Sequence, residues 1–427
     1  MHSRWRDKIV CMVGLGYIGL PTAAVLASRG IRVLGVDTNP QIVESVNASC
    51  VRIVEPDLDM LVHASVAQGK LSASGVPAPA DVFVIAVPTP FDACHEADLS
   101  YIEAAAHSVA PVLCPGNLVI LESTSPIGAT EQMSAWLAQL RPDLSFPQTV
   151  GEVSDIRIAH CPERVLPGRI LRELVDNDRV IGGMTPKCAR LAASLYATFV
   201  HGECVETTVR TAEMCKLAEN AFRDVNIAFA NELSMICDKL NIDVWELIKL
   251  ANRHPRVDIL RPGCGVGGHC IAVDPWFIIK KSPEHATLMR AAREVNDTKP
   301  GWIIDKVEGA VDSLMQQGMM EEDIRIACLG LAFKADVDDL RESPALAITA
   351  ALARRYPGQV QAVEPNIENL PQTLVDLGVM ASELESACRE CLVIVLLVEH
   401  AEFKKHQFTP ANNQRLIDSI GIWKAQQ

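Results

Sequence analysis

The segment from residue 8 to residue 37 constrains the fold more than any other part of the chain. An apolar run at residues 8–13 enters Gly14-Leu-Gly16-Tyr-Ile-Gly19, and a helical stretch and a second apolar run (residues 31–36) follow. In this arrangement the first glycine makes a tight turn, the second lets the backbone approach a pyrophosphate, and the third lets helix pack on strand. The segment therefore predicts a Rossmann-like dinucleotide-binding domain at the start of an α/β protein.

The residue that ends the second apolar run indicates which dinucleotide binds. Asp37 stands where a carboxylate accepts hydrogen bonds from a ribose 2′-hydroxyl, and the same carboxylate would repel a 2′-phosphate. We therefore predict NAD rather than NADP, with its phosphates at the helix N-terminus behind the glycines.

Three further apolar runs, at residues 81–87, 118–121 and 156–160, continue the alternation of strands and helices. Loops after strand ends line the ligand crevice of a doubly wound sheet. Thr89, Thr124 and Thr130 are therefore candidates to touch cofactor or substrate, or they cap the following helices. Glu163 and Arg164 follow another strand and either face the crevice or form an ordinary loop ion pair.

A glycine-rich stretch at residues 261–277, RPGCGVGGHCIAVDPWF, presents a candidate nucleophile. Cys270 follows three glycines that can press close to a ligand, and Asp274 comes four residues later. The alternative is a tight turn with a buried cysteine, since free cysteines are often buried.

Residues 211–241 contain neither glycine nor proline and predict one long helix with a long apolar stripe. Lys216, Asn220 and Arg223 lie on its polar face, which is either solvated or held near the thiol, where a lysine could stabilise an oxyanion. His254 and Arg256 belong to a small basic cluster that suits a diphosphate.

A second α/β unit follows from residue 324, with apolar runs at 324–330, 359–363 and 392–398. We expect helices at 287–297 and 302–317 before it. The predicted fold is α/β, with a Rossmann-like NAD-binding domain at residues 1–205, a central all-helical segment with the cysteine loop at 206–318, and a Rossmann-like α/β domain at 319–427.

Composition excludes several classes of protein. A net charge of −14 argues against nucleic acid as a partner. Fourteen scattered cysteines suit a reducing cytoplasm rather than a disulfide framework, and no metal-ligand spacing stands out. No export signal is visible, and the late apolar run at 391–398 is too short to span a membrane.

Taken together, the motifs resemble the UDP-sugar and GDP-sugar 6-dehydrogenases, which oxidise the C6 alcohol of a nucleotide sugar to a carboxylate. The resemblance covers nearly the whole chain, with its motifs in the family's order. They are VGLGYIGLPTA (13–23), VPTP (87–90), ESTSPIGAT (122–130), CPERVLPG (161–168), EMCKLAENAFRDVNIAFANEL (213–233), GVGGHCIAVDPWF (265–277), and GLAFK with DDLRESPA (330–334, 338–345).

The resemblance implies two hydride transfers to NAD, with Cys270 forming a thiohemiacetal and then a thioester. It implies catalytic roles for Cys270, Lys216, Asn220, Asp274, Glu163 and Thr124. The residues implied to contact NAD are Gly14, Gly16, Tyr17, Ile18, Gly19, Asp37, Thr89, Thr130 and Arg341. Those implied to bind the UDP-sugar are Arg164, Val165, Lys216, Asn220, Arg223, His254, Arg256, Gly267, Phe333 and Lys334. A homodimer through the long helix is also implied.

The Pro162-Glu163-Arg164-Val165 pattern resembles the branch that acts on UDP-N-acetylhexosamines, with the manno, gluco and galacto epimers all open. The chain departs from the family at Cys264, where we expect proline, and at Ile420, where we expect arginine. Cys264 could pair with Cys270 in an inhibitory disulfide, or be inert. His269 lies beside the nucleophile, but the resemblance assigns proton transfer to the lysine and the aspartate. We therefore expect His269 to be structural, as histidines in loops usually are.

Two rival functions remain compatible with the nucleotide motif. A two-electron β-hydroxyacid dehydrogenase shares the first domain and a lysine on a long helix, but it has no use for GVGGHC. A non-catalytic NAD-binding or nucleotide-sugar sensor would not need Cys270, Lys216, Asn220 and Asp274 together.

Overall fold

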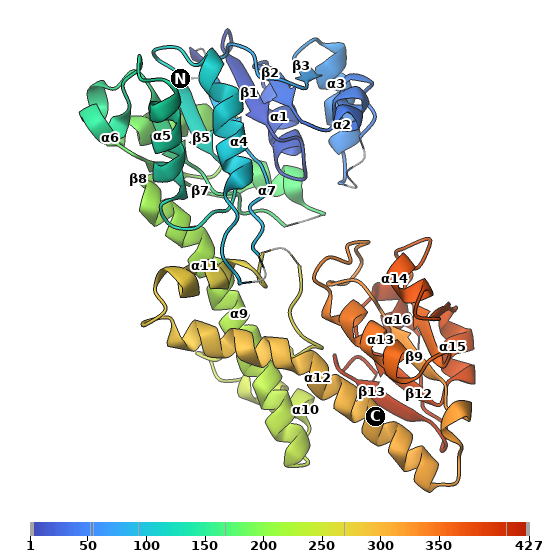
Figure 1. The fold of residues 1–427 in the computed structure, drawn as a ribbon. Helices are drawn as coiled ribbons and strands as arrows, with labels where there is room; N and C mark the ends of the chain where they lie inside the picture. Colours follow the sequence, from blue (N-terminus) through green and yellow to red (C-terminus); the bar gives the residue numbers. More distant parts are fainter. Residues whose placement is uncertain are drawn as a thin grey trace. The chain divides into compact units, whose positions relative to one another are not determined.

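The fold comes from a computed structural model, which describes residues 4–51, 53, 55–92, 94–166, 168–268, 270–406 and 408–423 (Figure 1). These residues form two compact units. The first comprises Met1–Glu219 and Trp276–Lys281, and the second comprises Asn220–Pro275 and Ser282–Gln427. Two helices, α9 and α11, contribute residues to both.

The first unit is built on an eight-stranded sheet in the order β3-β2-β1-β4-β5-β6-β7-β8. All neighbouring strands are parallel except β6 and β7. The central strands are buried along their whole length, which explains why they are nearly continuous apolar runs. The strands are β1 (Ile9–Val13), β2 (Arg32–Val36), β3 (Leu71–Ser74), β4 (Val82–Ile85), β5 (Leu118–Leu121), β6 (Arg157–His160), β7 (Arg179–Gly183) and β8 (Cys204–Thr208).

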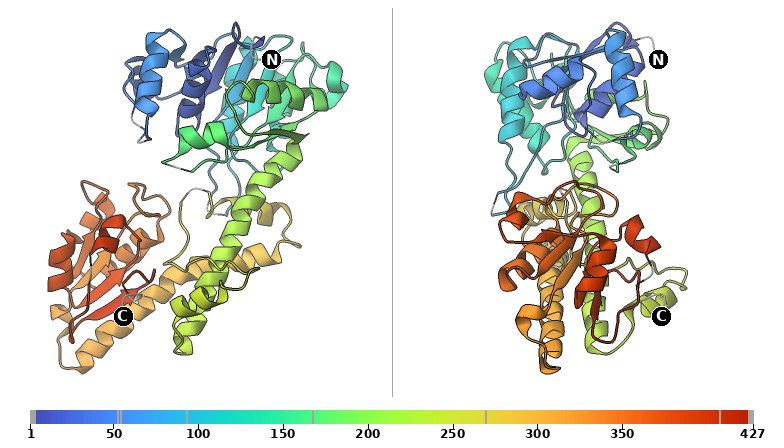
Figure 2. Two further views of the ribbon diagram at one scale, coloured as in Figure 1. Left: turned by 180° about the vertical axis from the view of Figure 1, so that it is seen from behind. Right: turned by 90° about the vertical axis from the view of Figure 1, so that its right-hand side faces the viewer.

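Helices cover both faces of this sheet, as in a doubly wound fold (Figure 2). They are α1 (Gly19–Ser28), α2 (Pro40–Asn47), α3 (Leu58–Ala67), α4 (Ser100–Val109), α5 (Ala129–Leu140), α6 (Pro147–Val150), α7 (Ile170–Asp176) and α8 (Pro186–Tyr196), with one-turn 3₁₀ helices at Ala110–Val112 and Gly151–Val153. In the sheet, Val13 pairs with both Val36 and Ile85, so the ends of β1, β2 and β4 meet at one edge. The glycine turn and Asp37 therefore lie side by side.

The second unit contains a five-stranded parallel sheet in the order β11-β10-β9-β12-β13. Its strands are β9 (Ile326–Leu329), β10 (Val360–Val363), β11 (Met380–Ala381), β12 (Val393–Leu396) and β13 (Arg415–Asp418). Its helices are α10 (Val244–Ala251), α12 (Thr287–Gln316), α13 (Pro344–Arg355), α14 (Gln372–Val375), α15 (Leu384–Glu390) and α16 (Ala401–Lys405), with a 3₁₀ turn at Glu321–Asp323. This confirms the predicted α/β class with a Rossmann-like unit at each end of the chain.

Helix α9 (Val209–Lys239) confirms the predicted long helix, and its second half packs on α12. Arg293 Nη1 donates to Asp224 Oδ1 at 2.7 Å, and Asn231 Nδ2 donates to Asn296 Oδ1 at 2.9 Å. Lys299 Nζ donates to Ser234 Oγ at 2.6 Å. These side chains are buried, so the two helices are joined by a polar network as well as by apolar packing.

The prediction of two helices at 287–297 and 302–317 was wrong. The structure has one continuous helix, α12, with Pro300 inside it. Proline removes one backbone donor, but Asn296, Lys299 and Ile303 on either side of it are buried. Their tertiary contacts outweigh the local preference for a break.

Sequence reasoning did not predict the last strand of the first sheet. Strand β8 (CVETT) follows β7 at the sheet edge and is half-exposed and polar. An edge strand of this composition carries no apolar run for sequence reasoning to detect.

Candidate active site

The three glycines of the turn after β1 differ in the space around them. Gly14 has a φ of +95°, and a Cβ there would lie 2.4 Å from the carbonyl oxygen of Ala86. A Cβ at Gly19 would lie 1.9 Å from the carbonyl oxygen of Gly14. A Cβ at Gly16 would meet nothing within 4 Å. Gly14 and Gly19 are therefore required by packing, whereas the open space at Gly16 leaves the backbone accessible to a ligand, which fits a bound dinucleotide.

Asp37 is held at this turn by the backbone. Its Oδ2 accepts the N–H of Leu15 at 3.0 Å and its Oδ1 accepts the N–H of Asn39 at 2.9 Å. These bonds fix the carboxylate beside the glycines while the side chain stays half-buried. Tyr17 and Ile18 precede α1 at the same edge, with Tyr17 38% exposed. The arrangement suits recognition of a ribose hydroxyl.

The three candidate threonines have different partners. Thr89 donates its hydroxyl to the carbonyl oxygen of Thr124, which joins the loops after β4 and β5. Thr130, fully buried at the start of α5, donates through Oγ1 to Glu213 Oε1 at 2.7 Å. Glu213 also accepts the N–H of Gly128 at 2.7 Å. Sequence reasoning missed this buried carboxylate of α9, which holds the α5 N-terminus.

Glu163 lies after β6 and is 8% exposed. Burial raises the pKa of its carboxyl to about 7, although the positive charges of Lys216 and Arg179 act in the opposite direction. Lys216 is itself only 8% exposed, so the interpretation of a solvated helix face is wrong for this residue. A buried carboxyl close to a lysine, with a pKa near neutrality, is suited to proton transfer.

A second buried ionic cluster, missed by sequence reasoning, acts electrostatically on Glu163. Arg179 Nη1 lies 3.8 Å from Glu122 Oε1, and Tyr196 donates its hydroxyl to the same oxygen at 3.3 Å. Burial raises the pKa of Glu122 to about 7, opposed mainly by Arg179. Glu122 directly follows β5, Arg179 belongs to β7 and Tyr196 to α8, and no local sequence signal links them.

Arg164 forms an ion pair rather than facing open solvent. Its Nη2 lies 2.6 Å from Glu219 Oε1, and Nε donates to Glu219 Oε2 at 3.1 Å. The neighbouring Val165 donates its N–H to the carboxylate of Glu163. The loop after β6 is thus tied to its own acidic residue and, through Glu219, to α9.

In the second unit, Cys270 and Asp274 lie one turn apart at the start of α11 (Asp274–Lys281). The carbonyl oxygen of Cys270 accepts the N–H groups of Val273 and Asp274 at 3.1 and 2.8 Å. Asn220 Nδ2 donates to Asp274 Oδ2 at 2.5 Å. Cys270 is exposed and Asp274 is 2% exposed. The structure therefore brings together the predicted amide, carboxylate and thiol segment, and it excludes the interpretation of Cys270 as a buried cysteine.

The glycines before Cys270 allow this loop to contact the segment after β9. A Cβ at Gly267 would lie 2.3 Å from the carbonyl oxygen of Glu342, and one at Gly268 would lie 2.8 Å from the ring of Phe333. Gly268 also donates its N–H to the carbonyl oxygen of Arg341 at 3.3 Å. Any larger side chain would separate the cysteine loop from Phe333.

The remaining predicted ligand residues of the second unit are spread over several segments. Arg341 donates through Nε and Nη2 to the carboxylate of Asp339 at 2.8 and 2.6 Å. Arg256 donates its N–H to His254 Nδ1 at 3.3 Å in the loop after α10. Arg223 is exposed on α9, and Lys334 is half-buried. His269 lies outside the described residues.

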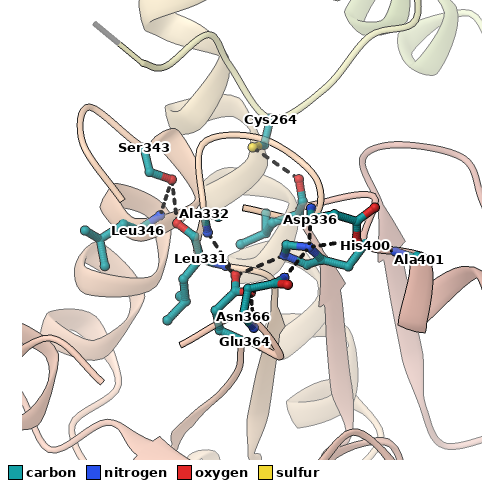
Figure 3. Close-up of polar contacts among 11 residues, drawn as sticks. Cys264, Leu331, Ala332, Asp336, Ser343, Leu346, Glu364, Asn366, His400 and Ala401 are labelled. Carbon is teal, nitrogen blue, oxygen red and sulfur yellow. Dashed lines mark hydrogen bonds and ion pairs between the residues drawn. The ribbon is translucent and has the colours of Figure 1, made fainter. Parts of the chain in front are cut away.

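Cys264 is a core residue. It is 5% exposed, and its thiol donates to the carbonyl oxygen of Leu397 at 3.5 Å (Figure 3). Burial raises the pKa of this thiol to about 12, so the reactive thiolate is not populated near neutrality. These properties favour the inert interpretation over a regulatory disulfide. At the other departure, Asp418 accepts the N–H groups of Gly421 and Trp423 at 2.6 and 2.9 Å, so this turn forms around Ile420 without arginine.

In the described part of the chain, every helix is too short or too polar to span a bilayer. The His, Cys, Asp and Glu side chains of this part nowhere gather in a group of three or more that could hold a metal ion.

Most of the chain matches one family of proteins. Three profiles of the UDP-glucose/GDP-mannose dehydrogenase family cover it: the NAD binding domain at residues 8–200, the central domain at 210–298 and the UDP binding domain at 327–425. A UDP-N-acetyl-D-mannosamine dehydrogenase of Yersinia pestis is 57% identical over 98% of this chain and 99% of its own. An NDP-N-acetyl-D-galactosaminuronic acid dehydrogenase of Ralstonia nicotianae is 58% identical over 98% and 97%.

Solved structures agree with this match. The structure of a UDP-D-ManNAc dehydrogenase from Pyrococcus horikoshii superposes with a TM-score of 0.85, at 38% identity, over 97% of this chain and 96% of that one.

Proposed function

Since the chain belongs to the UDP-glucose/GDP-mannose dehydrogenase family of NAD-dependent oxidoreductases, we propose that it oxidises UDP-N-acetyl-D-mannosamine at C6 to UDP-N-acetyl-D-mannosaminuronate. The relative from Yersinia pestis bears that sugar in its name. The name of the relative from Ralstonia nicotianae contains a galactosaminuronic acid, so UDP-N-acetylgalactosamine is one alternative substrate. UDP-N-acetylglucosamine is the other.

The observation that carries the proposal is the hydrogen bond between Asn220 and Asp274, which orients both side chains, with Asp274 one turn after Cys270. An alcohol dehydrogenase that stopped at the aldehyde would need no thiol there. Going on to the acid requires a nucleophile, because an aldehyde offers no hydride until something has added to it.

In the first oxidation, Lys216 and Asn220 would face the C6 oxygen. They lie four residues apart in α9, one helical turn, so their heads project from one side of the helix. The lysine would accept the hydroxyl proton, and the amide would donate to the oxygen as negative charge develops. Gly14, Gly16, Gly19 and Asp37 would hold NAD+, which would accept the hydride in each oxidation.

In the second oxidation, the Cys270 thiolate would add to the C6 aldehyde carbon, and the oxygen would take up a proton to give a thiohemiacetal. Loss of hydride and of that proton leaves a thioester, and water then cleaves the C–S bond and returns the thiol. Glu163 would remove a proton from the attacking water, which Thr124 and Asp274 would help to hold.

The UDP-sugar would be held mainly by cations and loop backbone. Arginine suits a diphosphate because it can donate two parallel hydrogen bonds. We assign this binding to Arg164, Val165, Arg223, His254, Arg256, Gly267, Phe333 and Lys334. We assign further NAD contacts to Tyr17, Ile18, Thr89, Thr130 and Arg341.

A substrate panel tests the proposal. Purified enzyme with NAD+ should release two NADH per UDP-N-acetylmannosamine, with a kcat/KM at least about 10-fold above that for UDP-N-acetylglucosamine, UDP-N-acetylgalactosamine and UDP-glucose. Absorbance at 340 nm counts the NADH, and mass spectrometry identifies the uronate.

Other outcomes of the panel have definite meanings. A higher kcat/KM for the galacto or gluco epimer would make that epimer the substrate and would leave the proposed oxidation at C6 unchanged. One NADH per sugar would point to a two-electron dehydrogenase. Tight NADH binding without turnover of any UDP-sugar would point to a sensor.

We further propose a homodimer through α9. Phe222, Phe229 and Ile236 recur every seven residues on one side of the helix and are 72%, 54% and 48% exposed. Apolar side chains in such a row usually mark an interface. Replacing Phe222 and Phe229 together by lysine should therefore shift the mass in solution, measured by light scattering, from dimer to monomer.

The control for the dimer test is Val153→Lys, which adds charge at a valine that is 80% exposed in the first unit. This variant should remain dimeric. A double-lysine variant that stays dimeric would move the interface elsewhere.

The uronate product suits bacterial surface polysaccharides such as enterobacterial common antigen, and we place its synthesis in the cytoplasm, where nucleotide sugars and reduced cysteines occur.

A further inference from the structure

The second unit repeats the backbone arrangement of the NAD cradle. In both units an acidic residue ends a strand, and its carboxylate accepts an N–H from the neighbouring glycine-containing turn. In the first unit, Gly14 donates its N–H to Val36 O at 2.8 Å, and Leu15 and Asn39 donate theirs to the Asp37 carboxylate at 3.0 and 2.9 Å. In the second unit, Gly330 donates its N–H to Val363 O at 2.8 Å, and Leu331 and Asn366 donate theirs to the Glu364 carboxylate at 2.7 and 3.1 Å.

The two carboxylates differ in what else they touch. Asp37 is half-buried, whereas the side chains of Glu364 and His400 are fully buried against each other, with Nε2 3.0 Å from Oε2. Burial alone would raise the pKa of Glu364, but hydrogen bonds from His400 and from the N–H groups of Leu331 and Ala332 lower it to about 2. The Glu364 carboxylate is therefore ionised and already paired with His400. The Asp37 carboxylate, in contrast, is placed to accept a hydrogen bond from a ribose.

The hydrogen bonds of His400 define the roles of its two ring nitrogens. Its Nδ1 lies 3.0 Å from the N–H of Asp336 and 2.9 Å from the amide nitrogen of Asn366, so it accepts (Figure 3). The ring proton therefore lies on Nε2 and is donated to Glu364. Both ring nitrogens are used, and the edge-on ring of Phe403 fixes the plane of the imidazole.

This pair holds the loop 331–336 at both ends. Leu331 and Ala332 donate their N–H groups to Glu364 at 2.7 and 2.9 Å at one end. At the other end, Asp336 donates to His400 and accepts the N–H of Ala401 at 2.8 Å. Asp336 has a φ of +58°, a conformation that a residue other than glycine adopts only when its surroundings hold it there.

We propose that His400 and Glu364 are a positioning pair that holds the loop carrying Phe333 and Lys334 in the conformation that receives the nucleotide of the UDP-sugar. The inference rests on the proposed function, because that function assigns Phe333 and Lys334 to binding of the UDP-sugar. Neither member of the pair touches substrate in this proposal.

The benefit of such a pair is preorganisation. A loop that is ordered before binding loses less conformational entropy when the ligand arrives, so its effect falls on binding rather than on the chemical step. The loop also contacts the cysteine segment, since the ring of Phe333 leaves no room for a side chain at Gly268. The backbone of Cys270 is also held by the N–H groups of Val273 and Asp274, so we expect displacement of Phe333 to fall mainly on the nucleotide contacts.

His400→Ala tests the pair. We expect the KM for the UDP-sugar and the dissociation constant for UDP, measured by calorimetry, to rise at least about 10-fold, as expected for losing two or three hydrogen bonds that hold the loop. We expect kcat to change less than about twofold and the KM for NAD+ to rise less than the KM for the UDP-sugar, because the glycines and Asp37 of the NAD cradle lie in the first unit and Arg341 is the one assigned NAD contact in the second. Unchanged UDP affinity in a folded His400→Ala protein would overturn the proposal.

Two further variants separate positioning from general destabilisation. His400→Gln keeps an amide donor that can reach Glu364, and it should recover at least half of the lost UDP affinity on a logarithmic scale. Leu352→Ala removes a fully buried side chain of α13 in the same unit, outside the loop 331–336 and its hydrogen bonds. It should lower the melting temperature and leave UDP affinity within about twofold. Equal weakening of UDP binding by Leu352→Ala would assign the effect to stability and overturn the proposal.

The design also distinguishes this inference from the proposed function. A wild-type enzyme that binds UDP but oxidises no UDP-sugar would refute the proposed function, whereas the UDP affinities of the variants would still decide the role of His400.

Discussion

Cys270→Ser should reduce uronate formation by at least about 10³-fold while the protein still folds and binds NADH. A serine hydroxyl remains protonated near neutrality and is a far weaker nucleophile towards the aldehyde than a thiolate. Because Cys270 is exposed, the substitution leaves the packing of the loop unchanged. The measurements are NADH released per sugar and mass spectrometry of the sugar product.

Two control variants support the interpretation. Cys114→Ser changes another exposed thiol and should keep wild-type activity. Cys264→Ala removes the neighbouring buried thiol and should also stay active, because that thiol packs in the core of the second unit. A Cys270→Ser enzyme that forms the uronate at the wild-type rate would rule out the thioester route.

Glu163→Gln should slow thioester hydrolysis by about 10²-fold or more, because glutamine cannot accept a proton from water. The acyl-enzyme would then accumulate, and intact-mass spectrometry would detect it as an adduct on Cys270. The pKa of Glu163 is raised to about 7. Below that pH the carboxyl keeps its proton and cannot act as a base, so wild-type kcat should rise with pH through about 7, and the variant should lose this rise.

Glu152→Gln is the matched control, because Glu152 is an exposed carboxylate of the same unit that pairs with Arg190. It should leave both the rate and the pH profile unchanged. If Glu163→Gln kept the wild-type pH profile, the ionisation that limits the rate would belong to another group, and Glu163 would have no role as the base.

Local sequence signals were sufficient for the main features of the fold. Strands buried on both faces must be apolar along their length, so β1, β4 and β5 were visible as runs of aliphatic residues. The glycine motif predicted the turn because only glycine tolerates the contacts at Gly14 and Gly19. Edge strands such as β8 and β11 were missed because half-exposed residues carry no such pattern.

The candidate site was less predictable, because its interactions join residues that are distant in sequence. Family resemblance selected Asn220 and Asp274, and the hydrogen bond between them became visible only in the structure. The pairing of Glu122 with Arg179 has no local signature at all. The catalytic and binding roles assigned to these residues stay predictions until the variants are measured.

The two carboxylate turns are similar in sequence. Val363-Glu364-Pro-Asn366 at the end of one apolar run resembles Val36-Asp37-Thr-Asn39 at the end of another. The partner of the Glu364 carboxylate, His400, lies 36 residues further along the chain, and comparison of these two short segments could not identify it.

Helix α12 determines how this protein can be dissected. Its side chains Ile303, Val307 and Val311 belong to the same buried cluster as strands β9 and β12. A fragment beginning after the helix would expose this apolar surface of its sheet to water and would tend to aggregate. The C-terminal sheet is therefore not an autonomous module, and a truncation intended for expression should begin before Thr287.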